Sequence, residues 1–138
     1  MQSLRRGMTR RLRSEAGASS VELLVFFPLL LLIVLLTVQV ALSWYGNEVA
    51  TSTAREVARE VRSGSADSSA IAAAKADGEA YAHRVGGKAL TEVTVDVVVI
   101  GNQVSVQVTG RSMDIIAGFS PTVRSSVTSE RETFREDT

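Results

Sequence analysis

The sequence contains no cysteine, two prolines and one histidine, and aromatic residues make up only 5% of it. Without cysteine no disulfide can form, so any exported domain must be stabilised by packing or by neighbouring subunits. A zinc site would need a cluster of cysteine or histidine ligands, which the sequence lacks. A catalytic relay through the single His83 is not expected, because this residue is predicted to lie on an exposed helix face. The sequence also lacks a glycine-rich phosphate loop. We therefore expect no enzymatic activity, no cofactor and no metal site.

Charged side chains are absent from 25 consecutive residues, 23–47, here called the uncharged run. At 1.5 Å per residue, a helix of this length measures about 37 Å and can cross a hydrocarbon core of about 30 Å. The arginines that precede the run are Arg5, Arg6, Arg10, Arg11 and Arg13. Positive charge beside a first membrane helix favours the cytoplasmic side. We predict a single-pass protein of the plasma (inner) membrane with its N-terminus inside and its C-terminal domain outside. Because no aromatics are interleaved with the arginines, nucleic-acid binding is not expected.

Three parts follow from this pattern: a basic cytoplasmic leader (residues 1–17), a transmembrane helix (18–46) and a small extracytoplasmic domain (47–138). About 90 residues suffice for one small core and no more. Pro28 is expected to kink the transmembrane helix, either as a tolerated bend or as a flexible point. Trp44 and Tyr45 close the uncharged run, where amphipathic rings favour the membrane interface, so we predict that they are interface anchors.

Helical spacing of small and branched side chains continues beyond the membrane, which predicts one helix from about 21 to 62. The residues that share this spacing are Ala50, Ala54, Val57, Ala58 and Val61. Asp67 is suited to cap a second helix over about 67–85, which Gly78 would weaken. The side chains expected on one face of this second helix are Ile71, Ala74, Tyr81, Ala82 and Val85.

Alternating valines predict strands over about 91–100 and 103–110, joined by a two-residue turn at Gly101 and Asn102. In that register Val99 faces Val104, Val97 faces Val106 and Val95 faces Val108, so all six valines lie on one face. A third strand is expected over about 121–128, with Val123 and Val127 on one face. The predicted fold is α+β, with a long N-terminal helix, a shorter helix and a three-stranded antiparallel sheet whose valine face packs on the long helix.

Glu22 stands at the start of the uncharged run and permits two interpretations. Its spacing from Ser19 matches a capping box at a helix N-terminus. Alternatively, a carboxylate at the membrane edge is costly without a partner, which makes it a functional-site candidate.

Gly17, four further residues, Glu22 and an apolar helix together resemble the processing site of type IV pilin-like proteins. More narrowly, the chain resembles TadE-like minor pseudopilins of the tight-adherence (Flp) pilus system. Val21-Glu22, Pro28 six residues after the glutamate, and the stretch Ala54-Arg55-Glu56-Val57-Ala58-Arg59 carry this resemblance.

The resemblance implies a pilin-like fold and cleavage between Gly17 and Ala18 by a prepilin peptidase. Glu22 would then be the fifth mature residue, in position to pair with the new α-amine of its own or a neighbouring helix and so to guide assembly. The implied partners are the prepilin peptidase, other pilins and pseudopilins, the inner-membrane assembly platform and the lipid bilayer. Oligomerisation through the N-terminal helix and incorporation into an extracellular pilus are also implied.

Two other functions compete with pilus assembly. An unprocessed bitopic anchor could display a small adhesion or ligand-binding domain, and it would not depend on a prepilin peptidase. A secreted domain could instead be released by signal peptidase at Ala41-Leu42-Ser43, although the uncharged run is much longer than the apolar region of an ordinary signal peptide.

Overall fold

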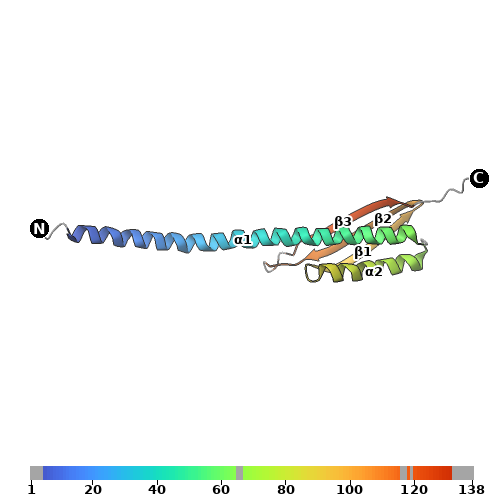
Figure 1. The fold of residues 1–138 in the computed structure, drawn as a ribbon, viewed down its shortest axis with the longest axis horizontal. Helices are drawn as coiled ribbons and strands as arrows, with labels where there is room; N and C mark the ends of the chain where they lie inside the picture. Colours follow the sequence, from blue (N-terminus) through green and yellow to red (C-terminus); the bar gives the residue numbers. More distant parts are fainter. Residues whose placement is uncertain (1–4, 65–66, 116–117, 119, 132–138) are drawn as a thin grey trace, which may run out of the picture. The chain divides into compact units, whose positions relative to one another are not determined.

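The computed structural model describes residues 5–64, 67–115, 118 and 120–131, with side chains from Ser20 onward. Two helices precede three strands (Figure 1). They are α1 (Arg5–Ser63), α2 (Ser68–Gly86), β1 (Leu90–Ile100), β2 (Gln103–Ser112) and β3 (Thr122–Glu130). The predicted α+β class is confirmed. The chain divides into an N-terminal unit, Met1–Val38, and a C-terminal unit, Gln39–Thr138.

α1 begins at Arg5, so the prediction of a start near Val21 is wrong. Gly7 and Gly17 do not interrupt it, because one glycine costs a helix only about 1 kcal/mol and the arginines, leucines and alanines around them are good helix formers. The helix also continues through Pro28. Its end at Ser63 agrees with the prediction, and the Gly64 N–H donates to the Glu60 carbonyl oxygen at 3.0 Å beyond that end.

From Val21 to Val38, nearly all apolar side chains of α1 are exposed, on every side of the helix. From Ser20 onward α1 is long and apolar enough to cross a membrane, and its most apolar stretch is not buried within the protein. A helix that is apolar all round requires an apolar environment. The N-terminal unit therefore fits a single-pass membrane anchor.

Several hydroxyl groups of α1 donate to the carbonyl oxygen one turn back along the same helix. Thr37 Oγ1 donates to the Ile33 oxygen at 2.8 Å, and Ser43 Oγ donates to the Gln39 oxygen at 2.9 Å. Thr53 Oγ1 does the same toward Val49, at 2.8 Å. These polar side chains satisfy their donors locally, without a partner from another element.

The sheet has the strand order β1-β2-β3 with antiparallel neighbours, and its register matches the prediction. Val99 pairs with Val104, Val97 with Val106 and Val95 with Val108, and these six residues form the valine face. β3 adds Val123, which is buried, and Val127, which is half-buried against the core. In Figure 1 the sheet lies alongside the second half of α1. The predicted packing of the valine face on this half of α1 is confirmed by their shared core.

α2 packs on α1 and β1 through small residues, and the predicted face of this helix is wrong in part. Its buried residues are Ala74, Gly78, Ala82 and Gly86, at intervals of four. A Cβ atom on Gly78 would lie within 2.3 Å of Val57 Cγ2 and within 3.6 Å of Val95 Cγ2. Val85 is exposed instead. Gly78 is therefore a site of close helix approach, where a larger side chain would displace α1.

Candidate functional site

The predicted processing site lies within the helical backbone of α1. Gly17 and Ala18 are both helical, and Glu22 follows one turn later with its side chain exposed. Among the residues that the structure describes, Glu22 has neither a hydrogen-bond nor an ion-pair partner. The capping-box interpretation is wrong for the uncut chain, because α1 has already run for several turns before Ser19. Glu22 is thus a carboxylate next to the apolar stretch, with no partner among the side chains that the structure describes.

Trp44 and Tyr45 lie on α1 just after the start of the C-terminal unit, and they differ in their surroundings. The Trp44 side chain is 74% exposed. The Tyr45 hydroxyl donates to the carbonyl oxygen of Val85 at 3.2 Å, at the end of α2. An aromatic body with a satisfied polar tip suits a boundary between apolar and aqueous surroundings. Their proposed role as interface anchors stays a prediction.

Gln39 makes a two-point contact that the sequence analysis missed. Its side chain is only 2% exposed. Gln39 Nε2 donates to the Met113 carbonyl oxygen at 3.1 Å, and Gln39 Oε1 accepts the Ile115 N–H at 2.9 Å. The amide therefore satisfies two main-chain groups of the segment that follows β2. The available signal was an amide side chain within the uncharged run, and its partners lie more than 70 residues away.

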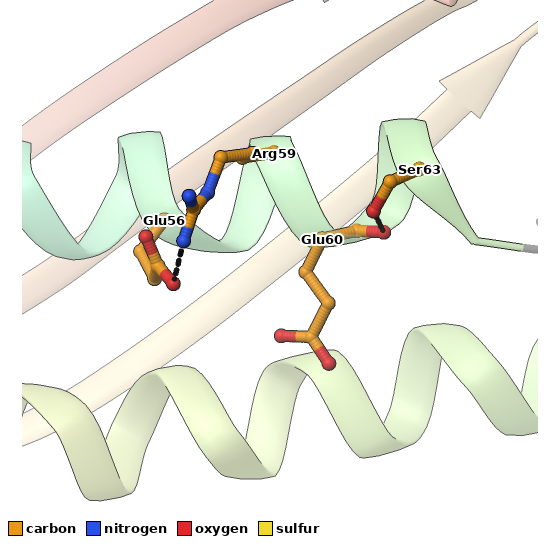
Figure 2. A network of polar contacts seen from close by, with 4 residues as sticks. All are labelled: Glu56, Arg59, Glu60 and Ser63. Atoms are coloured by element: carbon orange, nitrogen blue, oxygen red, sulfur yellow. Dashed lines mark hydrogen bonds and ion pairs between the residues drawn. The ribbon is translucent and has the colours of Figure 1, made fainter.

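The stretch that carried part of the family resemblance forms the amphipathic second half of α1. Ala54, Val57 and Ala58 are buried in the core. On the outer side Glu56 Oε1 accepts from Arg59 Nη2 at 2.6 Å, as Figure 2 shows. Nearby, Ser63 Oγ donates to the Glu60 carbonyl oxygen at 3.1 Å, and the Glu60 carboxylate points toward α2 (Figure 2). Since this ion pair is largely exposed, it contributes little to stability.

His83 lies exposed on α2, as predicted. In the described part of the chain, no group of three or more histidine, cysteine, aspartate or glutamate side chains could hold a metal ion. The chemistry available at the candidate site is therefore that of one carboxylate and of a helix that needs an apolar environment.

Residues 17–59 match the family model described as TadE-like protein. This segment covers less than half of the chain, and over it the chain is similar to TadE-like proteins of the Tad (Flp) pilus system. The match begins at Gly17 and includes Glu22, Pro28 and the second half of α1 up to Arg59. No curated protein and no solved structure matches the chain significantly.

Proposed function

We propose that this protein, which matches the TadE-like family model over residues 17–59, is a minor pseudopilin that takes part in assembly of a tight-adherence pilus. The observation that carries this proposal is where the family match starts. It begins at Gly17 and leaves out the arginine-rich residues before it. That boundary lies one residue before the cleavage point between Gly17 and Ala18 that the resemblance to type IV pilin-like proteins implies. In the proposed pathway a prepilin peptidase removes the leader on the cytoplasmic side, and the mature chain acts through interactions rather than catalysis.

The chemistry of Glu22 supports a role in assembly. Cleavage after Gly17 would create an α-amine on Ala18, with an ordinary pKa near ~8, so this amine is mostly cationic at neutral pH. It would lie about one helical turn from the Glu22 carboxylate, which has no partner among the described residues. In a low-dielectric helix bundle, an unpaired charge costs several kcal/mol, so pairing between subunits would favour one axial register. The partners would be other pilins and the inner-membrane assembly platform.

Intact mass of the protein purified from membranes tests the processing step. Cells with an active prepilin peptidase should yield a chain lacking Met1–Gly17, and cells without that peptidase should yield the full chain. A full-length chain in peptidase-active, piliated cells would overturn the proposal.

A matched pair of substitutions tests the role of the acid. Glu22→Ala should insert in the membrane and be processed but should impair piliation. Glu15→Ala changes an acid within the leader and should leave piliation unchanged. Normal piliation with Glu22→Ala would remove Glu22 from the mechanism.

A second candidate is an unprocessed bitopic anchor that displays a ligand-binding domain. Its support is the separate, compact C-terminal unit. It predicts the same intact mass with and without the peptidase. Release at Ala41-Leu42-Ser43 has weaker support, because the cut would separate Gln39 from Met113 and Ile115.

A further inference from the structure

One end of the C-terminal unit carries exposed apolar side chains on a segment whose main chain is hydrogen-bonded to the uncharged run. Met113 and Ile115 are 39% and 43% exposed. Both are held at their main chain by Gln39, which lies one residue beyond Val38. These residues follow β2 and take no part in the core. Packing within the described part of the chain therefore gives no reason for these two apolar side chains to lie at the surface.

The helix rise places Gln39 near the edge of a bilayer. Counted from Leu23, a hydrocarbon core of about 30 Å takes about 20 residues of helix and ends near Leu42. Gln39 lies three residues, or about 5 Å, before that end, and Trp44 follows just beyond it with a largely exposed side chain. Main-chain groups bonded to the Gln39 side chain must lie within a few ångströms of the same depth.

The hydrogen bonding around Met113 suits surroundings that are poor in water. The Met113 N–H donates to the Ala89 oxygen at 3.2 Å, and its carbonyl oxygen accepts from Gln39. The Ile115 N–H is also satisfied by Gln39. Irregular main chain at the depth of a membrane is tolerated only where protein groups satisfy it in this way. Asp114, exposed between the two apolar residues, keeps this segment at the headgroup level, since a carboxylate in the hydrocarbon is costly.

We infer that this end of the C-terminal unit rests on the lipid surface, with the Met113 and Ile115 side chains in the interfacial layer. The inference needs only that α1 spans the membrane, and it does not depend on processing or pilus assembly. The opposite end of the sheet offers a control surface. Ile100 is 72% exposed, and it lies about 33 Å along β1 from Leu90, whose side chain is close to Gly46 of α1.

Because the chain has no cysteine, single cysteines can be introduced without background. Ile115→Cys, Ile100→Cys and Leu31→Cys are made in the full chain, spin-labelled and placed in phospholipid nanodiscs that hold one copy each. Accessibility to oxygen and to a water-soluble nickel complex is then measured by electron paramagnetic resonance. Cysteine at position 115 keeps the N–H that binds Gln39, so the variant should remain folded.

We expect the label at position 31 to be lipid-like, the label at 100 to be open to nickel, and the label at 115 to show severalfold lower nickel access than that at 100. Equal nickel access at 115 and 100, with 31 lipid-like, would overturn the inference and leave the membrane anchor intact. Protection at 115 that appears only with several copies per disc would assign this surface to a protein partner and would also overturn it. Nickel access at position 31 would reject both the membrane-spanning helix and the inference.

Discussion

The two halves of α1 share one backbone type but have opposite surroundings. Between Leu23 and Val38 the helix is ringed by leucine, phenylalanine and valine, and nearly all of these side chains are exposed. Between Val49 and Val61 small residues and valines form one buried stripe, while arginines and glutamates occupy the other side. Both segments are helical, and the distribution of their side chains decides whether a segment is suited to lipid or to a protein core.

The largest difference between the halves should appear when one leucine is truncated in each unit. Leu90 is fully buried, so Leu90→Ala should reduce the free energy of unfolding of the C-terminal unit by about 3 kcal/mol. Hydrogen–deuterium exchange of the strands in detergent-solubilised full chain measures this loss. Leu31→Ala, at an exposed position of the N-terminal unit, should leave strand exchange unchanged. Equal effects of the two substitutions would contradict the division into a lipid-facing half and a core-facing half.

A bulky residue at the helix–helix contact should have the next largest effect. Gly78→Leu places side-chain atoms where Val57 already lies, and overpacking of this kind costs about 2 kcal/mol. Exchange rates across α2 and β1 report the loss. Ala76→Leu, on the exposed side of the same helix, is the matched control and should be neutral or slightly destabilising, because leucine is almost as good a helix former as alanine. If Gly78→Leu were equally neutral, the close approach of α2 and α1 would be refuted.

Gln39 marks the boundary between the two halves, and its substitution should act locally. Gln39→Leu removes both contacts and leaves the partly buried Ile115 N–H without its partner, which costs about 1 kcal/mol. The Ile115 amide should lose its protection from exchange while membrane insertion persists. Gln103→Leu, at an exposed position of the hairpin, should not change that amide. Unchanged protection with Gln39→Leu would show that the segment is held by something else.

The start of α2 depends on a side-chain cap. Asp67 Oδ1 accepts the Ala70 N–H at 2.7 Å, so Asp67→Ala should destabilise α2 by about 1 kcal/mol. Faster exchange in the first turn of α2 is the expected signal, and Asp67→Asn, which retains a side-chain acceptor, should restore slow exchange. Failure of asparagine to do so would assign the effect to charge rather than to capping.

The smallest effect is expected at the exposed ion pair of α1. Glu56→Gln removes the charge that faces Arg59 and should change stability by no more than about 0.5 kcal/mol. High salt should erase even this difference, because it screens the pair in the unmodified chain. A larger loss that persists in high salt would indicate that the outer side of α1 stabilises the fold through contacts beyond this pair.

The sheet was predictable in detail because its information is local. Two valine alternations flank a two-residue turn, and that turn sets the register in which the valines oppose one another on one face, so the pairing of Val97 with Val106 followed directly. The irregularity between Thr91 and Thr94 was not predictable from this pattern. There Glu92 adopts a φ of 50°, and a glutamate in the sequence does not predict such a backbone conformation.

The helix contacts were less predictable because they depend on distant partners. Gly78 looked like a weak point of α2, although its lack of a side chain is what admits Val57. Gln39 looked like an ordinary member of an uncharged stretch, since its partners follow β2. At the candidate site, Gly17 was located by the resemblance to a pilin-like processing site, and Glu22 also by its position as a carboxylate at the start of the uncharged run. Their proposed roles depend on a peptidase and on other subunits, which the fold of one chain does not contain.

The hydroxyl groups of α1 that bond to its own main chain suit this helix to both lipid and protein surroundings. Thr37 and Ser43 each carry their own acceptor one turn away, so neither demands a water molecule or a neighbouring protein. Moving such a rod from a bilayer into a protein bundle exchanges dispersion contacts but breaks no hydrogen bond at these positions. The free-energy cost of moving α1 from a bilayer into a protein bundle therefore depends on the fit of its side chains and on its few charges, and not on these hydroxyl groups.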